Sequence, residues 1–174
     1  ASIETSAVKD GDHYVINGSK MFITNGSFAD TLILAARTSK GGRHRDISVF
    51  LFDTSTPNFS ASKLKKIGHH MSGTSALYFE DCRVPAERLL GEEGQGFYAI
   101  MNTFQAERLV VSAYSLGAAQ KVFEDALNYA QQRVAFGRPI GKFQVVGHKL
   151  ADMTIELQAS RQLLYHASWL FQEG

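Results

Sequence analysis

A carboxylate and a guanidinium stand side by side within an otherwise apolar run at residues 103–112, TFQAERLVVS. At about 100° per residue, a helix would give Glu107 an almost wholly apolar face. Ionised carboxylates are costly to bury among apolar groups, by several kcal/mol, roughly, unless they are paired. In a water-poor pocket, such a carboxylate suits a general base that removes a proton from a weakly acidic C–H bond. The side chains that share this face are Ile100, Thr103, Phe104, Val110, Val111, Tyr114 and Ala118.

Glu107 also has a purely structural interpretation. It could pair with an Arg or Lys from a packed helix, because ion-pair networks also bury carboxylates. Arg108 lies one position round the helix, over Phe97, Met101 and Ser115, where an arginine is by default a surface or interface residue. The spacing alone leaves both interpretations of Glu107 open.

The composition is typical of a globular chain, with 174 residues, 44% of them hydrophobic, 12 Phe and only 3 Pro. A formal net charge of +1 without a basic stripe argues against nucleic acid as the main partner. No apolar run is long enough to span a bilayer. Cys82 is the single cysteine and fits a reducing compartment. His69 and His70 would point to opposite faces of a strand, so we predict no metal site.

Short alternating segments separated by turn-forming residues extend from Ile3 to about Pro85. Because no helical pattern separates them, they predict an antiparallel β-sandwich or barrel-like domain. The segments are residues 3–9, 12–16, 19–24, 30–38, 46–53, 59–64 and 75–84.

The pattern changes after GEEGQG, where apolar residues recur at helical spacing over residues 97–132 and again over 142–171. AFGRPIG separates the two stretches and predicts a break between antiparallel helices. We therefore expect an α+β chain with a β domain at residues 1–93 and helices of a bundle at residues 94–174. The chain starts without Met and stops just after an amphipathic segment, so we expect a fragment of a longer protein.

Four stretches, in this order, resemble the acyl-CoA dehydrogenase family: INGSKMFITNG, FEDCRVPAERLLGEEGQGF, AERLVVSAYSLGAAQ and QQRVAFGRPIGKFQVVGHKLADM. The resemblance extends over essentially the whole chain. It implies a three-domain fold with N-terminal helices, a middle β domain and a C-terminal four-helix bundle. This chain would then supply the middle β domain, without its first part, and the first two helices of the bundle.

The resemblance implies FAD as the cofactor. Phe22 matches an aromatic, commonly Trp, that lies against the flavin ring, and Thr24 matches a hydroxyl that hydrogen-bonds near flavin N5. Arg133 and Phe136 match residues that reach the FAD of a neighbouring subunit, the arginine toward the pyrophosphate, and Gln144 matches a further contact. Without the family, Phe22 and Thr24 would be an ordinary strand pair, and Arg133 a cation at a helix end.

The family carries its catalytic glutamate at one of two places, and Glu107 matches the one used by isovaleryl-CoA and long-chain acyl-CoA dehydrogenases, directly before an arginine. The resemblance therefore implies that Glu107 removes the α-proton of an acyl-CoA while flavin N5 takes the β-hydrogen as hydride, giving a trans-2-enoyl-CoA. Phe104 and Arg108 would contact the substrate. The class of acyl chain stays open.

The resemblance further implies an electron-transferring flavoprotein as electron acceptor and a homo-oligomer, a dimer or tetramer. It places the protein in the bacterial cytoplasm or the mitochondrial matrix. One departure is His70, which stands where the family often has an arginine. The alternatives are an acyl-CoA oxidase or another flavin-dependent or non-catalytic relative on the same scaffold. We expect the 174 residues alone to bind FAD weakly and to be inactive.

Overall fold

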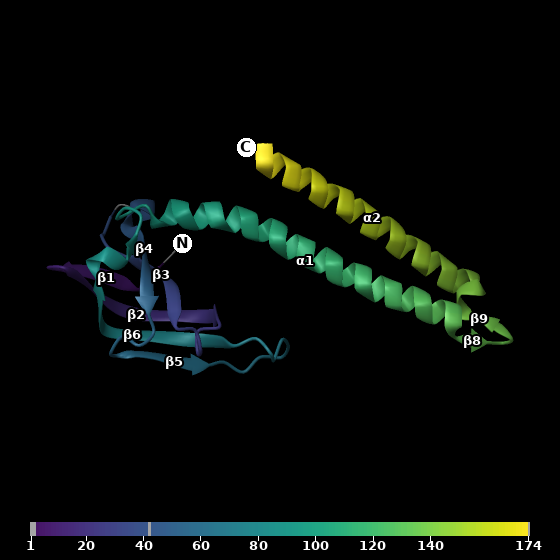
Figure 1. Ribbon diagram of the computed structural model, residues 1–174, viewed down its shortest axis with the longest axis horizontal. Helices are drawn as coiled ribbons and strands as arrows, with labels where there is room; N and C mark the ends of the chain where they lie inside the picture. Colours follow the sequence, from purple (N-terminus) through teal and green to yellow (C-terminus); the bar gives the residue numbers. More distant parts are fainter. Residues whose placement is uncertain (1–2, 42, 174) are drawn as a thin grey trace. The chain divides into compact units, whose positions relative to one another are not determined.

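The computed structural model describes residues 3–41 and 43–173, and the chain divides into two compact units, Ala1–Met101 and Asn102–Gly174. The first unit contains a seven-stranded sheet, and the second contains most of two long helices (Figure 1). The boundary between the units falls within helix α1 (Gly96–Gln132).

The sheet of the first unit has the strand order β5-β6-β2-β1-β3-β4-β7. Neighbouring strands pair in antiparallel fashion except β1 and β3, which meet in parallel at Ser6 and Arg37. The strands are β1 (Ser6–Asp10), β2 (His13–Thr24), β3 (Thr31–Arg37), β4 (Ile47–Asp53), β5 (Phe59–Lys63), β6 (Thr74–Pro85) and β7 (Leu89–Leu90).

The sheet curls around a single apolar core. Strands β4 and β6 are separated by three strands in the sheet order, yet the rings of Phe52 and Phe79 lie 5.1 Å apart. Likewise, Tyr14 on β2 meets Phe50 on β4 edge to face at 4.9 Å. Such contacts across non-adjacent strands require a sheet that closes toward itself, as a barrel-like domain does. The predicted α+β class is therefore confirmed.

One detail of the strand prediction is wrong. NGS, residues 17–19, lies inside the long strand β2 and does not end it. Here β6 carries one extra residue, and Asn17 bonds reciprocally to Asp81, with its amide donating to the carboxylate at 2.9 Å. Gly18 is required because a Cβ atom there would lie 2.8 Å from the Cα of Thr5. Strand β7 and the parallel contact of β1 with β3 were also not predicted, since both are too short to leave a pattern.

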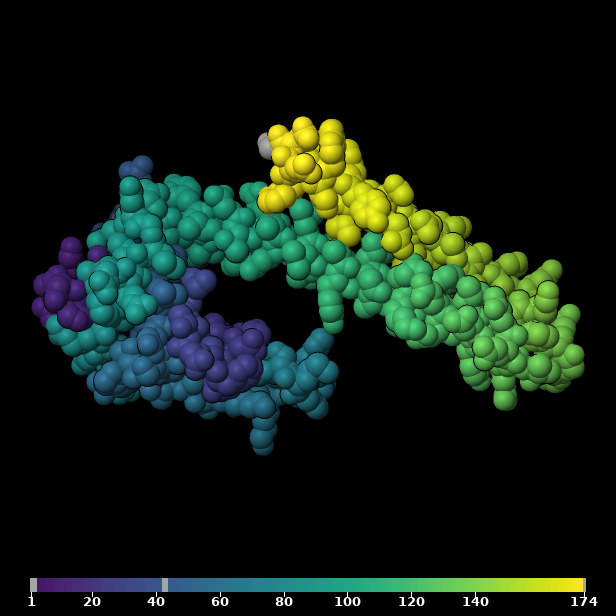
Figure 2. Space-filling model, in the orientation of Figure 1, coloured from purple at the N-terminus to yellow at the C-terminus, as the bar shows by residue number. Residues whose placement is uncertain are grey.

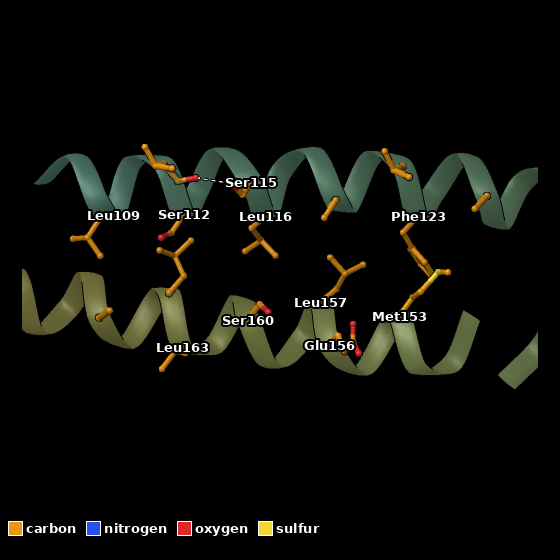
Figure 3. Close-up of a pocket in the computed structure, with 16 residues that line it drawn as sticks. Leu109, Ser112, Ser115, Leu116, Phe123, Met153, Glu156, Leu157, Ser160 and Leu163 are labelled. Carbon is orange, nitrogen blue, oxygen red and sulfur yellow. Dashed lines mark hydrogen bonds between the residues drawn. The ribbon is translucent and has the colours of Figure 1, made fainter. Parts of the chain in front are cut away.

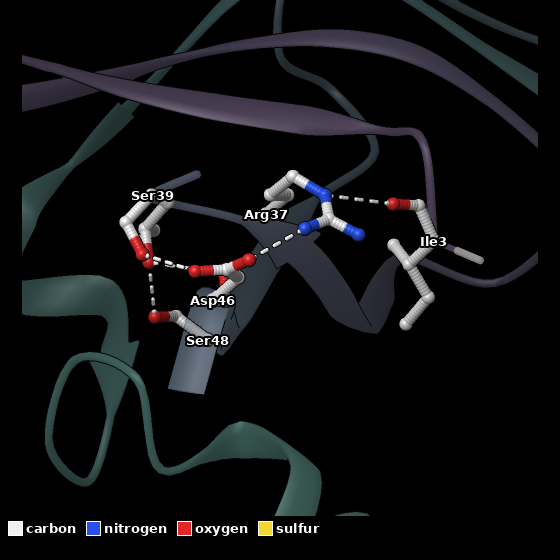
Figure 4. Close-up of polar contacts among 6 residues, drawn as sticks. Ile3, Arg37, Ser39, Asp46 and Ser48 are labelled. Atoms are coloured by element: carbon white, nitrogen blue, oxygen red, sulfur yellow. Dashed lines mark hydrogen bonds and ion pairs between the residues drawn. The ribbon is translucent and has the colours of Figure 1, made fainter. Parts of the chain in front are cut away.

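A buried carboxylate joins the end of β3 to the start of β4 (Figure 4). Asp46 is 1% exposed and accepts hydrogen bonds from Arg37 Nη1 at 2.7 Å and from the Ser39 hydroxyl at 2.8 Å. Arg37 Nε donates to the carbonyl of Ile3 at 3.1 Å. The ion pair thus also holds the chain that precedes β1.

The GEEGQG loop that leads into α1 is anchored to the sheet. The Gly94 amide donates to the hydroxyl of Ser48 at 2.9 Å, and a Cβ atom on Gly94 would lie 2.6 Å from the carbonyl oxygen of Arg45. The hydroxyl of Tyr14 donates to Glu93 at 2.7 Å. The glycines of this loop therefore permit a close approach that fixes where α1 begins.

The Tyr14 phenol makes the stability of the first unit vary with pH in the alkaline range. Burial, and then the hydrogen bond to Glu93, raise the pKa of Tyr14 from 10.0 to about 12. The contribution of the phenol to folding is therefore complete below pH 10 and is lost as the pH rises toward 12.

We expect Tyr14→Phe to lower the free energy of unfolding by about 1 kcal/mol at neutral pH, because one hydrogen bond is lost. We also expect it to flatten the pH dependence of that free energy between pH 10 and 12. Denaturant titrations over this pH range measure both effects. A variant that keeps the alkaline slope of the wild type would contradict the assignment.

The second unit is an antiparallel helical hairpin. Helix α1 is followed by the short strands β8 (Val134–Ala135) and β9 (Arg138–Pro139), a 3-10 turn (Ile140–Lys142) and α2 (Gln144–Glu173). Both helices agree with the predicted stretches within two residues. Figure 2 shows them in contact in the part of the chain coloured green to yellow, where Arg161 donates to the side chain of Gln120 at 2.9 Å.

Candidate functional site

Glu107 lies in an open groove of about 480 Å³ on α1. Phe104, Arg108, Val111 and Ser112 line the same groove, so the predicted base and both predicted substrate contacts come together. The Ser112 hydroxyl donates to the backbone carbonyl of Arg108 at 2.8 Å, so the hydrogen-bond donor of Ser112 is already used within the helix. The carboxylate of Glu107 is exposed toward the groove.

No ion pair or hydrogen bond of the Glu107 carboxylate occurs among the side chains that the structure describes. The structural interpretation of Glu107 required a cationic partner on a packed helix, and α2 provides none within these residues. Arg108 is exposed, and its guanidinium forms no ion pair with a carboxylate in the described part of the chain. This pattern leaves Glu107 free to meet a ligand.

The helix face around Glu107 is apolar and exposed. Val110, Val111 and Tyr114 are 67%, 63% and 70% exposed. The described residues therefore form an open apolar surface, and not a closed pocket, next to the carboxylate. An apolar ligand or a further protein surface that covered this face would remove water from around Glu107.

The two helices also enclose a longer groove of about 850 Å³ (Figure 3). Its walls are mostly apolar, and Glu156 is a carboxylate on the α2 side. Labelled residues of both helices face one another across it, among them Leu116 of α1 and Leu157 of α2. Glu156 and Glu107 thus lie in different grooves of the same unit, which makes Glu156 a useful control for Glu107.

The predicted flavin contacts Phe22 and Thr24 lie at the end of β2. Met21 and Phe22 together face the single residue Ala76 of β6, so β2 carries a β-bulge at this point. Phe22 has a φ of 60°, and its side chain is 75% exposed. Thr24 is also exposed. The bulge turns an aromatic side chain outward where regular alternation would not.

Phe136 occupies the turn of the β8–β9 hairpin. Phe136 and Gly137 have φ values of 51° and 79°, and a two-residue hairpin turn with positive φ at both central residues matches type I′. Such turns favour Asn-Gly, and an aromatic residue at the first central position costs roughly 1–2 kcal/mol. The ring of Phe136 is nevertheless 96% exposed. The chain therefore presents this aromatic at a strained position.

Phe22 and Phe136 are the only aromatic carbocycles among the described non-glycine residues with positive φ. The others are Asn, Asp or His, the types that tolerate this conformation best. Strain of this kind concentrates at functional sites. The described residues with positive φ are Phe22, Asn25, Asn58, His69, Asp81 and Phe136.

Arg133 and Gln144 lie on either side of the same hairpin. Arg133 follows the last residue of α1, and Gln144 is the first residue of α2. Both are exposed, and neither side chain has a hydrogen-bond partner within the described part of the chain. The structure thus brings Arg133, Phe136 and Gln144 together at one end of the second unit, whereas Phe22 and Thr24 belong to the first.

Two residues at this end were not singled out from the sequence. The guanidinium carbon of Arg138 lies 4.3 Å from the ring centroid of Phe143, and that ring meets Phe136 at 6.3 Å and 85°. The cation and the aromatic are five positions apart across a turn, so neither strand nor helix spacing indicates their contact.

The histidines and the long helices add no further site. Within the described ranges, no group of three or more His, Cys, Asp or Glu side chains could hold a metal ion. His69 has a φ of 51°, and His70 bonds to the carbonyl of Lys66. In the same ranges, neither long helix is apolar enough over a sufficient length to cross a membrane.

Two family models match the chain. The model for the acyl-CoA dehydrogenase middle domain matches residues 1–82, and that for the C-terminal domain matches residues 94–174. Among curated proteins, the chain is 45% identical to a short-chain-specific acyl-CoA dehydrogenase of Megasphaera elsdenii, over 98% of this chain and 45% of the relative. It is also 45% identical to mitochondrial isovaleryl-CoA dehydrogenase of Oryza sativa subsp. japonica, over 94% of this chain and 40% of that protein.

Solved structures share the fold. Butyryl-CoA dehydrogenase of Megasphaera elsdenii matches with a TM-score of 0.92 and 45% identity, over 99% of this chain and 45% of that one. A structure described as the electron-transferring flavoprotein of Acidaminococcus fermentans matches with a TM-score of 0.93 and 44% identity, over 99% of this chain and 46% of that one. The prolyl acyl carrier protein oxidase AnaB matches with a TM-score of 0.89 and 36% identity, over 97% of this chain and 45% of that one.

The chain spans less than half the length of the curated relatives it matches. The two family models nevertheless cover all but residues 83–93, in the order expected for one protein. With the shared fold and the identities above, they show that this chain belongs to the acyl-CoA dehydrogenase family.

Proposed function

We propose that this chain is part of a longer enzyme that oxidises an acyl-CoA thioester to a trans-2-enoyl-CoA with FAD as cofactor. Residues 1–93 would be its middle β domain and residues 94–174 the first two helices of its C-terminal bundle. The observation that carries the proposal is Glu107, an unpaired carboxylate within an apolar helix face, since the reaction needs a base beside an acyl chain.

Glu107 would remove the α-proton of the substrate. Glu107 would meet the acyl chain on the apolar helix surface, where a bound substrate would displace water from around the carboxylate. The lack of an internal cationic partner supports this role, because an ion pair would stabilise the charged form. Phe104 and Arg108 line the same groove and would contact the substrate.

The residues present fit a flavin dinucleotide. Phe22 and Phe136 are exposed aromatics in strained conformations, suited to lie against flat rings. Thr24 would donate to the flavin, and Arg133 and Gln144 would hold the phosphate side, where a guanidinium gives paired hydrogen bonds. When bound, FAD supplies the acceptor for the β-hydrogen, which leaves the substrate as hydride.

The proposal includes partners and a location. We infer an electron-transferring flavoprotein as the acceptor of the electrons, which the structural match to a protein of that description supports. We also infer a homo-oligomer, since Arg133 and Phe136 would serve the cofactor of a neighbouring subunit. The matched relatives include bacterial and mitochondrial proteins, which favours the bacterial cytoplasm or the mitochondrial matrix.

An oxidase is the second candidate function, because one matched structure of the same fold is described as an acyl carrier protein oxidase. Both activities need the same base and the same flavin contacts. They differ in the electron acceptor: an oxidase passes electrons to oxygen, and a dehydrogenase passes them to another protein.

Anaerobic bleaching of the flavin by a panel of acyl-CoAs tests the proposal on the full-length protein. We expect thioesters of one chain class to bleach the flavin, and admission of air to release little hydrogen peroxide. Rapid, stoichiometric peroxide release would instead identify an oxidase. If no thioester bleached the flavin, the proposed reaction would be wrong.

Phe136→Asn should stabilise the second unit while it weakens FAD binding. Asn tolerates a φ near 51° better than Phe does, so we expect a gain of about 1 kcal/mol in the free energy of unfolding. Urea titration followed by the fluorescence of Trp169, the single tryptophan, measures the gain. Phe171→Asn, at a helical position, should give no gain. A Phe136→Asn chain that is less stable than the wild type would show that the turn is not strained.

A further inference from the structure

The segment around the β8–β9 hairpin is strongly cationic. No acidic residue occurs between Asp125 and Asp152, although the whole chain nearly balances 18 Lys and Arg against 17 Asp and Glu. Over the same interval the chain carries Arg133, Arg138, Lys142 and Lys149. The nearest carboxylates in the sequence thus lie outside the hairpin, and the potential around the turn favours anions.

Arg138 is held in place by an aromatic and not by an acid. Its guanidinium carbon lies 4.3 Å from the centroid of the Phe143 ring. In the described part of the chain, its N–H groups have no hydrogen-bond acceptor and no carboxylate partner. A guanidinium stacked on a ring keeps its N–H edge open, and that edge matches phosphate oxygens in bidentate geometry.

The hairpin pairing brings Arg138 close to Arg133. Ala135 pairs with Arg138, and the Ile140 amide donates to the carbonyl of Arg133 at 2.8 Å. Arg133 and Arg138 are therefore diagonal neighbours across the ribbon. For such neighbours we expect Cα atoms about 7–8 Å apart and side chains on the same face. Two long guanidinium side chains at this separation can reach neighbouring phosphates of one ligand.

We infer that Arg138 is a second phosphate-binding residue, which joins Arg133 in a two-guanidinium site for the diphosphate of a dinucleotide. The identity of that ligand as FAD rests on the proposed function, whereas the diphosphate chemistry rests on the hairpin itself. The exposed ring of Phe136 lies at the same turn and offers a stacking surface for a flat base. A monophosphate would need only one of the two guanidinium groups.

Titration calorimetry on the 174-residue chain with inorganic pyrophosphate, ADP and adenosine tests the inference. We expect pyrophosphate and ADP to bind and Arg138→Gln to weaken both about tenfold or more, because a hydrogen bond between charged groups is lost. The affinity for adenosine should not change. The matched control is Lys65→Gln, which removes one exposed positive charge from the first unit, outside the hairpin segment, and should change the affinities less than twofold, roughly.

Arg138→Lys separates charge from geometry. Lysine retains the positive charge but lacks the planar fork, so we expect an intermediate affinity for pyrophosphate. Circular dichroism of each variant checks that the helical hairpin is intact. The inference is overturned if the wild-type chain binds neither anion, or if Arg138→Gln binds both as tightly as the wild type. Failure of acyl-CoA to bleach the flavin would overturn the proposed reaction and leave this phosphate site standing.

Discussion

We expect Glu107→Gln to lower the rate at which acyl-CoA bleaches the flavin of the full-length protein by about 10²–10⁴-fold, while acyl-CoA still binds. Glutamine keeps the size and polarity of glutamate but cannot accept the α-proton, so the contribution of general base catalysis is lost. We expect binding to be retained, because the apolar residues that line the groove, Phe104 and Val111, are unchanged. Stopped-flow absorbance gives the rate, and titration of the flavin spectrum gives the affinity.

The matched control is Glu156→Gln, which makes the same chemical change in the groove between α1 and α2. We expect this variant to bleach at the wild-type rate. If Glu107→Gln also bleached at that rate, Glu107 would be a structural carboxylate, and the base would come from a part of the enzyme beyond residues 103–112.

Asp46→Ala has the largest expected effect on stability. Asp46 is 1% exposed and forms an ion pair with Arg37 at 2.7 Å, so its removal leaves the guanidinium without its partner. Breaking a buried pair in this way typically costs about 3–5 kcal/mol. Because the Arg37 side chain is 29% exposed and can still reach water, we expect a value near the lower end, about 3 kcal/mol.

Native-state hydrogen exchange of the β4 amides measures this loss, since these amides exchange only when the first unit opens. The exposed pair of Asp10 and Arg83, at 2.9 Å, supplies the control. Asp10→Ala should cost less than about 1 kcal/mol, because both members of this pair are exposed to solvent. Equal losses in the two variants would contradict the role given to the buried pair.

The helices could be predicted closely, and the strands less so. An apolar repeat sustained over 37 and 30 residues, without an internal proline, leaves little choice of structure. In the sheet, NGS has the composition of a turn, but the bonds between Asn17 and Asp81 keep it in β2. Those bonds join residues 64 apart in the chain, which no local pattern can indicate.

The candidate site was predictable in part for a similar reason. The position of Glu107 on an apolar face follows from helical periodicity, and the structure places it on such a face. The strained backbone of Phe22 and Phe136 does not follow from the sequence, because phenylalanine disfavours that conformation and only strand pairing imposes it. The stacking of Arg138 on Phe143 likewise depends on the 3-10 turn, Ile140–Lys142, that lies between them.

Exchange of the substrate α-proton with solvent deuterium tests the role of Glu107 most directly. An acyl-CoA whose β-carbon carries no hydrogen cannot be oxidised, so exchange reports proton removal alone. The proposed mechanism predicts that the wild-type enzyme exchanges the α-proton, and that Glu107→Gln slows exchange about 10²–10⁴-fold while Glu156→Gln does not. Exchange at the wild-type rate in Glu107→Gln would contradict it.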